Sequence, residues 1–269
     1  MMGANHAATG AAAWFAVAGS GPWMLGWYPV HSSGLLIGAA VCAGAAMLPD
    51  ADHHAGTIST SLPPLSRSVT RGVALVSGGH RHGTHSLLGI AVFAGLAGAL
   101  GGVRVPSAIG PLAVGAGLVS LLLVAYAAKA LRMTSEASWV RSWLLAAGVA
   151  AAITVFAPED PTWLAVAVGL GAAVHVAGDA LTTGGVPLLW PWTPDPPRWW
   201  ADNRVLRRVW QRNGWGGLPV LGRTGSTREW TFAVPVSAYA AYGLIVGFVE
   251  MLESASRWLP ARALAALAA

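Results

Sequence analysis

The chain has 269 residues, of which 55% are hydrophobic and only 10% are charged, and its mean hydropathy is +0.56. These values lie outside the ordinary range of soluble globular domains, so they exclude a soluble protein and indicate an integral membrane protein. The single cysteine, Cys42, cannot form an internal disulfide. Because it lies in an apolar stretch beside Ala and Gly, we expect it to serve packing alone.

Repeated apolar stretches predict an all-α, polytopic membrane helix bundle of about seven transmembrane spans. The stretches run over 6–20, 33–48, 84–101, 108–128, 140–157, 162–182 and 231–252. The first three, at about 15 to 18 residues each, are short for a hydrocarbon core of roughly 30 Å. Each of them could therefore tilt little, pack inside the bundle or enter the membrane only partway. The many glycines inside these stretches predict close contact between helices.

The apolar stretches also divide the chain into three parts. Residues 1–182 form the predicted membrane bundle, 183–230 a connecting loop, and 231–269 the last span with a C-terminal tail. The loop contains seven Arg and seven Trp. Trp prefers the headgroup level of a membrane and Arg is attracted to lipid phosphates, so we expect the loop to lie on the cytoplasmic membrane surface. A loop that only sets the topology, with no ligand, is the alternative.

The distribution of basic residues predicts the orientation, because cytoplasmic loops of membrane proteins carry the excess of Lys and Arg. If the seven spans alternate in direction, thirteen of the 16 Lys and Arg residues share the side of the N-terminus. The other three are Arg104, Arg257 and Arg262. We therefore expect a cytoplasmic N-terminus and an external C-terminus. Membrane topology accounts for the net charge of +5, and no nucleic-acid partner is expected.

Polar residues gather in four stretches that fall on the side of the basic loops. "NHAATG" opens the first apolar stretch, "LPDADHH" closes the second, "GGHRHGTHS" opens the third and "HVAGDALTTGG" closes the sixth. Seven of the eight histidines, all except His31, lie in these stretches. Helix ends on one side of a bundle can meet, so we expect these residues to converge in one pocket near the cytoplasmic membrane surface.

Spacing within these stretches favours shared ligands. His175 and Asp179 are four residues apart and share one helix face. His175 lies about 13 residues into its span, which places it about 20 Å from the far surface, and an ionisable pair at that depth is costly unless it is paired, hydrated or metal-bound. Asp50 and Asp52 lie at a helix end broken by Pro49, where irregular backbone can turn both carboxylates inward.

The candidate ligands combine carboxylates with imidazoles. They are His6, Asp50, Asp52, His53, His80, His85, His175 and Asp179. This mixture suits Zn²⁺ first, with Mn²⁺ or Fe²⁺ as alternatives, whereas the lack of Cys argues against a Cys-type zinc site. Because eight ligands are more than one tetrahedral ion needs, we expect one or two ions. For any one of these histidines alone, a hydrogen-bonded bundle residue is the alternative.

In this order the four motifs resemble those of the YdjM-like family of predicted membrane-bound, metal-dependent hydrolases. That family's pattern has an early His, then LPD-x-DH, then GHRG-x-TH-S, and then H-x-x-x-D followed by T-x-x-G-V-P-LLWP. Here the matching residues are His6, "LPDADH", "GHRHGTHS" and "HVAGDALTTGGVPLLWP". His82 departs from the pattern, which more often has Gly, so neither His82 nor His54 is counted as a ligand. The resemblance implies a multi-span bundle in the inner (plasma) membrane of a prokaryote and an assumed hydrolytic activity.

The residues are consistent with a metal-dependent hydrolase that acts on a phosphoester or acyl ester of a lipid-like substrate. The catalytic candidates are Arg81, Asp52 and Thr84. A bound ion would lower the pKa of its water, Asp52 would take the proton, and Arg81 would hold an anionic oxygen as charge develops. Alternatively, Arg81 would neutralise the acidic cluster and anchor the pocket. No G-x-S-x-G motif indicates a serine hydrolase, and Ser86 is expected to begin a helix.

Two other functions would use the same residues. A metal-ion transporter or metal sensor would bind an ion that moves or signals, but transport sites lie near the midplane of the membrane, whereas these residues gather at one face. A structural or partner-binding membrane protein would need no chemistry at all. Membrane lipid is the expected partner in each case, and the sequence does not indicate an oligomeric state.

Overall fold

The structure, a computed structural model, describes residues 1–134, 138–158 and 160–268. Within these residues the elements are helical and no strand is formed, which confirms the predicted all-α class. The α-helices are α1 (Gly3–Ala18), α2 (Ser32–Ala45), α3 (Leu65–Ser77), α4 (Leu87–Gly101), α5 (Val114–Ala130), α6 (Val140–Phe156), α7 (Trp163–Ala180), α8 (Arg198–Asp202), α9 (Leu206–Val209) and α10 (Thr227–Ala268). Two short 3-10 helices, η1 (Leu48–Asp52) and η2 (Gly83–His85), lie among them.

Within the described residues, three helical segments are long and apolar enough to cross a membrane. They are Ser32–Asp52, Trp163–Ala180 and Thr227–Ser254, and the apolar helices α4, α5 and α6 are shorter. Helix α1 has 16 residues and packs against α2, α7 and α10. Its position inside the bundle is one of the arrangements expected for the short first stretch. The total of seven crossings stays a prediction.

Glycines bring the central helices α1, α2 and α7 into close contact around Cys42. A Cβ added to Gly10 of α1 would lie 2.6 Å from the carbonyl oxygen of Cys42, and one added to Gly171 of α7 would lie 2.5 Å from the same oxygen. Side chains larger than hydrogen would force these backbones apart. Cys42 is buried in the core, which confirms that it serves packing.

Several predicted boundaries need correction. Residues 108–113, expected to begin a span, lie outside α5 because Val105 and Leu112 pair in an antiparallel bridge around Pro106 and Pro111. A proline also disfavours helical backbone in the residue before it. Helix α4 begins at Leu87, three residues later than expected, because Ser86 accepts a hydrogen bond from the N–H of Gly89. Ser86 is thus the helix-start residue that was predicted.

Helix α3 was missed, because residues 49–83 were treated only as a connection between spans. Its mean hydropathy is low, since Arg67 and Arg71 interrupt the apolar residues. Leu65, Val69 and Val73 nevertheless recur every four residues, which is the pattern of an amphipathic helix. Helix α3 contacts both η1 and η2.

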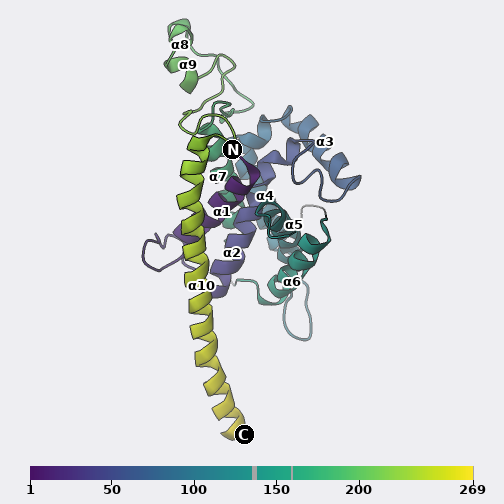
Figure 1. The fold of residues 1–269 in the computed structure, drawn as a ribbon. Coiled ribbons are helices and arrows are strands. Elements are labelled where there is room, and N and C mark those ends of the chain that lie inside the picture. The colour runs from purple at the N-terminus through teal and green to yellow at the C-terminus, as the bar shows by residue number, and fades with distance from the viewer. Residues whose placement is uncertain (135–137, 159, 269) are drawn as a thin grey trace.

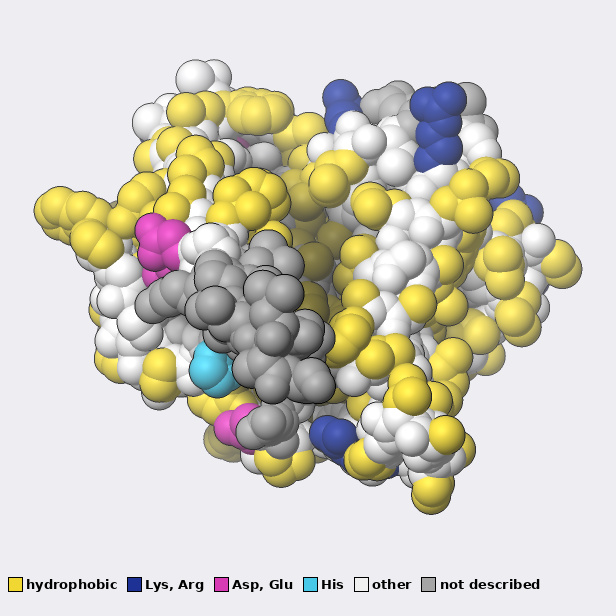
Figure 2. Space-filling model, turned by 90° about the horizontal axis from the view of Figure 1, so that it is seen from below, with side chains coloured by type: hydrophobic (Ala, Val, Ile, Leu, Met, Phe, Trp, Pro, Cys, Tyr) yellow, Lys and Arg dark blue, Asp and Glu magenta, His cyan; other side chains and the backbone are white. Residues whose placement is uncertain are grey.

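The two ends of the molecule differ in character. The N-terminus, α3, α8 and α9 lie at one end, and the C-terminal part of α10 extends away from the opposite end (Figure 1). The predicted C-terminal tail is therefore a continuation of the last helix. Figure 2 looks from the side of the C-terminus, where hydrophobic side chains dominate and charged ones are few. Along α10, Leu244, Ile245 and Phe248 are exposed, as expected for a helix in contact with lipid.

Candidate metal centre

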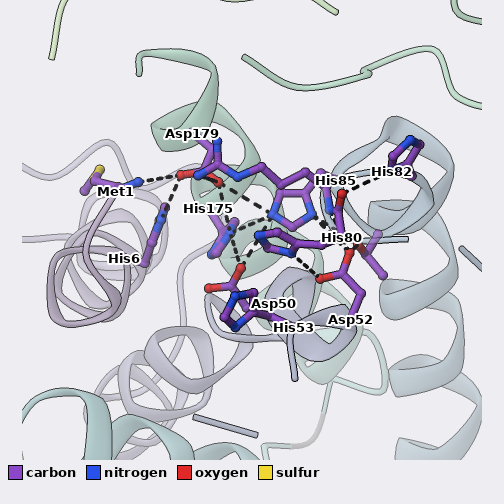
Figure 3. A network of polar contacts seen from close by, with 12 residues as sticks. Met1, His6, Asp50, Asp52, His53, His80, His82, His85, His175 and Asp179 are labelled. Atoms are coloured by element: carbon purple, nitrogen blue, oxygen red, sulfur yellow. Dashed lines mark hydrogen bonds and ion pairs between the residues drawn. The ribbon is translucent and has the colours of Figure 1, made fainter. Parts of the chain in front are cut away.

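The four polar motifs meet in one cluster, as predicted, although they come from four parts of the chain (Figure 3). The η1 turn contributes Asp50, the η2 turn contributes His85, and α7 contributes His175 and Asp179. Nε2 of His85 lies 3.2 Å from Nε2 of His175, and both nitrogens lie within 3.8 Å of Oδ1 of Asp50. His6 of α1 lies at the edge of the cluster, where its Nε2 is 3.2 Å from Oδ1 of Asp179.

The hydrogen bonds of His85 and His175 define which ring nitrogens carry protons. Nδ1 of His175 donates to the carbonyl oxygen of Ala46 at 2.6 Å, because a carbonyl can only accept. The hydroxyl of Thr84 donates its one proton to Asp52 at 2.6 Å, so Nδ1 of His85, at 3.1 Å, donates to that hydroxyl oxygen. In the neutral rings both Nε2 atoms are then unprotonated, and two lone pairs face each other.

Carboxylates complete the surroundings of these lone pairs. Oδ1 of Asp50 lies 3.7 Å from Nε2 of His85 and 3.8 Å from Nε2 of His175. Oδ2 of Asp179 lies at 3.6 Å and 3.8 Å from the same two nitrogens. Zn²⁺ binds N and O ligands at about 2.0–2.2 Å, so tetrahedral ligands lie about 3.3–3.6 Å apart. The cluster therefore has the ligand types and approximate spacing that a divalent ion requires.

In the part of the chain that the structure describes, three overlapping triads have ligand atoms that all lie within 4.8 Å of one another. The central triad is Asp50, His85 and His175, and it shares one residue with each of the others. The flanking triads are His6, His175 and Asp179, which are fully buried, and Asp50, Asp52 and His80, which reach the surface. The structure thus contains clusters able to hold a metal ion, without showing which ion.

Asp52 lies behind His80 and is buried. Its Oδ1 accepts a hydrogen bond from Nδ1 of His80 at 2.8 Å, and its Oδ2 accepts from the backbone N–H of Arg81 at 3.0 Å and from Thr84. This hydrogen bond from His80 to the carboxylate raises the pKa of the His80 imidazole, despite partial burial. The His80 side chain is 40% exposed, and its Nε2 has no hydrogen-bond partner among the described residues.

Asp179 is paired with cations on both oxygens. Oδ1 lies 2.6 Å from the amine of Met1, and Oδ2 lies 2.9 Å from Nη2 of Arg81. A buried carboxylate is costly without such partners. Arg81 reaches it from a backbone with φ of 61°, which is rare for a side chain of this size. The two glycines that end α3, Gly78 and Gly79, also have positive φ, so the turn that presents His80 and Arg81 is built from left-handed residues.

His6 has a buried nitrogen with no partner. Its ring stacks on His175 with a centroid distance of 3.7 Å. Its Nδ1 has no hydrogen-bond partner in the described structure, and Gly178 leaves room for the ring on α7. Unpartnered buried nitrogens are rare, and a ligand or ordered water is a common explanation.

His53, His54 and His82 lie near the cluster but in none of the three triads, and His31 lies at the far end of α2. His53, predicted as a ligand, has its Nδ1 3.3 Å from the backbone N–H of Ala55, and partial burial lowers the pKa of its imidazole. His54 stacks against His53, and His82 packs edge-on against Trp215. The structure therefore does not place His53 among the grouped ligand atoms, and its role as a ligand stays a prediction.

Two contributions could not be found from side-chain motifs. The carbonyl of Ala46 orients His175, and any residue type would supply the same group. Glu229, in the first turn of α10, accepts hydrogen bonds from the N–H of Met2 and from the side chain of Asn5, both at 2.6 Å, and so holds the start of α1 beside the cluster. The motif "NHA" at the start of the first stretch predicts a role for His6, but it does not indicate that Asn5 would bind Glu229.

Comparison with known proteins gives one family. No curated protein and no solved structure matches the chain. The sequence model of the YdjM inner membrane protein family matches residues 1–252, which include all four polar motifs, the apolar segments Ser32–Asp52 and Trp163–Ala180, and most of Thr227–Ser254. The chain therefore belongs to the YdjM inner membrane protein family.

Proposed function

We propose that this protein is a membrane-embedded, metal-dependent hydrolase that cleaves a phosphoester or acyl ester of a lipid-like substrate. The observation that carries the proposal is the pair of Nε2 atoms of His85 and His175, 3.2 Å apart, each with its Nδ1 proton already committed elsewhere. Two neutral imidazoles repel each other in this arrangement. A divalent cation between them removes that repulsion and uses both lone pairs.

Asp50, His85 and His175 would hold the ion, with Asp179 as a fourth ligand or as a neighbouring charge. Two imidazoles and one carboxylate form a ligand set typical of catalytic zinc, which keeps a position for water or substrate. Asp50 has a side chain that is 33% exposed, whereas the two histidines are fully buried, so the open position would lie on the side of Asp50. The flanking triads share no residue, so they would be the positions for two ions.

His80 is the residue best placed to move a proton. Both oxygens of Asp52 already accept hydrogen bonds, so Asp52 is not the free base that the sequence suggested. It instead holds Nδ1 of His80, whose side chain is 40% exposed and belongs to the same triad as Asp50. We assign Asp52 to positioning and His80 to acid–base chemistry.

The proposed reaction is hydrolysis of an ester bond by water. A divalent ion in this site would act as a Lewis acid, lowering the pKa of the attacking water and stabilising charge on the ester. His80 would take a proton from water as its oxygen bonds to the phosphorus or carbonyl carbon. The bond to the leaving alcohol then breaks, and the His80 proton passes to that alcohol. Arg81 is committed to Asp179, which supports the alternative that it neutralises and anchors the acidic cluster.

The membrane setting of the reaction is part of the proposal. The family is one of inner membrane proteins, and the excess of basic residues on the N-terminal side supports a cytoplasmic position for the cluster. The cell would be a prokaryote, and the substrate would reach the site from the cytoplasmic leaflet. Lipid is the proposed partner.

Metal content and hydrolysis should be measured on the same detergent-purified protein. We expect about one equivalent of Zn²⁺ per chain by mass spectrometry of the metal, and its loss in Asp50→Ala. Asp202→Ala is the matched control, because that carboxylate is exposed and forms a surface ion pair with Arg212, away from the cluster. His80→Asn should keep the metal but lower hydrolysis of phosphodiester and phospholipid substrates by about 10²–10⁴-fold.

The outcomes separate the possible functions. Two equivalents of metal would place ions in the flanking triads. Metal bound without hydrolysis of any ester would favour a carrier or sensor. Metal content unchanged in Asp50→Ala and in His175→Ala would exclude this cluster as the metal centre.

A further inference from the structure

An apolar groove of about 500 Å³ runs between α3 and α4 and ends at the cluster. Its walls include Val73 and Val76 of α3, Val92 and Phe93 of α4, and Trp190 from the segment after α7. Small-molecule sites have volumes of roughly 300–1,000 Å³, so the groove is large enough for a ligand. None of the residues of the three triads lines the groove.

The inner end of the groove coincides with the hydrogen-bonded network of the metal centre. Thr84 lines the groove, and its hydroxyl bonds to Asp52 and accepts from His85. Gly83, in the same η2 turn, also lines the groove and lies against Trp190. An acyl chain lying in the groove would therefore end against Thr84, the residue next to the proposed metal ligand His85.

The outer side of the groove is as hydrophobic as its walls. Leu88, Val92 and Leu96 of α4 are exposed, and Val76 of α3 is 84% exposed. Helix α4 is an apolar helix of a membrane protein, so we expect its exposed side to face hydrocarbon rather than water. The groove would then open sideways into the bilayer, where acyl chains are the molecules present.

We propose that this groove binds an acyl chain of the lipid substrate and so presents its ester to the metal centre. The placement of the ester rests on the proposed hydrolase function, but occupation of the groove by a chain does not. Each methylene buried in an apolar site strengthens binding about fourfold. A long chain should therefore bind far more tightly than a short one.

Gly72 offers a way to fill the groove without disturbing the fold. It lines the groove from α3, and a Cβ added there meets no atom within 4 Å. Gly72→Phe should occupy the groove with little strain. Gly95→Phe is the matched control, because Gly95 lies on α4, has equally open surroundings and does not line the groove.

The probe is a phosphatidic acid with a diazirine near the end of a palmitoyl chain, added to purified protein in a short-chain detergent. After irradiation, peptide mapping should find label at Val92 and Phe93 that saturates with probe. Unlabelled palmitoyl lipid should compete at least about 100-fold better than its octanoyl analogue. Gly72→Phe should reduce this labelling at least about tenfold, Gly95→Phe should not, and both should keep the metal.

Label confined to the exposed side of α10, or label unaffected by Gly72→Phe, would overturn the proposal. If the unmodified protein is a dimer and Gly72→Phe is a monomer, and labelling does not depend on chain length, a second copy covers the groove instead. Metal content and hydrolysis are measured on the same samples. Specific labelling without hydrolysis would count against the hydrolase function alone, whereas hydrolysis independent of chain length and of Gly72 would count against the groove alone.

Discussion

Single hydrogen bonds orient the proposed ligands. The Thr84 hydroxyl has one proton, which goes to Asp52, and this leaves its oxygen to accept from Nδ1 of His85. On the other side of the cluster, the carbonyl oxygen of Ala46 accepts a hydrogen bond from Nδ1 of His175. Groups of this kind hold the ring and its tautomer, and their loss typically weakens metal binding about 10–100-fold.

Thr84→Val should therefore lower zinc affinity by about 10–100-fold, because the isosteric side chain removes the acceptor for Nδ1 of His85. Competition with a coloured chelator measures this affinity directly. Thr84→Ser keeps the hydroxyl and should bind zinc nearly as well as the unmodified protein. Equal affinity in Thr84→Val and Thr84→Ser would show that the hydroxyl does not orient His85.

The i, i+4 spacing of His175 and Asp179 was enough to predict that both face one site, because a helix has a fixed period. The same reasoning could not show that Asp52 positions His80, nor choose between the two roles considered for Arg81. The hydrogen bonds from His80 and Arg81 to Asp52 come from a turn in which Arg81 adopts a backbone conformation that its residue type disfavours. The convergence of the four motifs was predictable from their common side of the membrane, but the hydrogen bonds within it were not.

At the scale of helices, contact between α2 and α7 supports the site. A Cβ on Gly171 would press on the carbonyl of Cys42, on Ala45 and on the N–H of Ala46. Gly171 is one turn before His175, and Ala46 is the residue that holds His175. The packing of these two helices and the orientation of a proposed ligand thus depend on the same few atoms.

Gly171→Ala should lower the free energy of unfolding by about 1–3 kcal/mol, since the added methyl overpacks the contact, and should also reduce bound zinc. Thermal melting in detergent and metal analysis test both effects. Gly148→Ala in α6 is the control, because a Cβ there meets open space, and it should stabilise the helix by about 0.5–1 kcal/mol. Gly171→Ala protein with normal melting and full metal would contradict a role for this contact.

Helix prediction from apolar runs succeeded for the long segments and failed where polarity and apolarity alternate. Helices α2 and α7 were found within a few residues, because their apolar residues are continuous. Helix α3 was not predicted, because Arg67 and Arg71 interrupt its apolar residues. The four-residue spacing of Leu65, Val69 and Val73 nevertheless indicates an amphipathic helix. The groove could not be predicted either, because α3 forms one of its walls.

At the scale of the whole molecule, the orientation in the membrane awaits a test. Cys42 is fully buried, so the native chain offers little background to a membrane-impermeant maleimide. Ser107→Cys, in the exposed turn between α4 and α5, should react in intact cells. Asn203→Cys, in the exposed Arg/Trp-rich segment, should react only after the cells are opened. Labelling of both sites in intact cells, or of neither, would contradict the predicted topology.

Glu229 ties the last helix to the first. It accepts hydrogen bonds from Met2 and from Asn5, which lies 224 residues earlier in the chain. A ribosome makes α1 first and α10 last, so α1 must wait for its capping carboxylate until almost the whole protein has been synthesised. The start of α1, which carries His6, would then be fixed in place only at the end of synthesis, and metal would be acquired by the finished protein rather than by the growing chain.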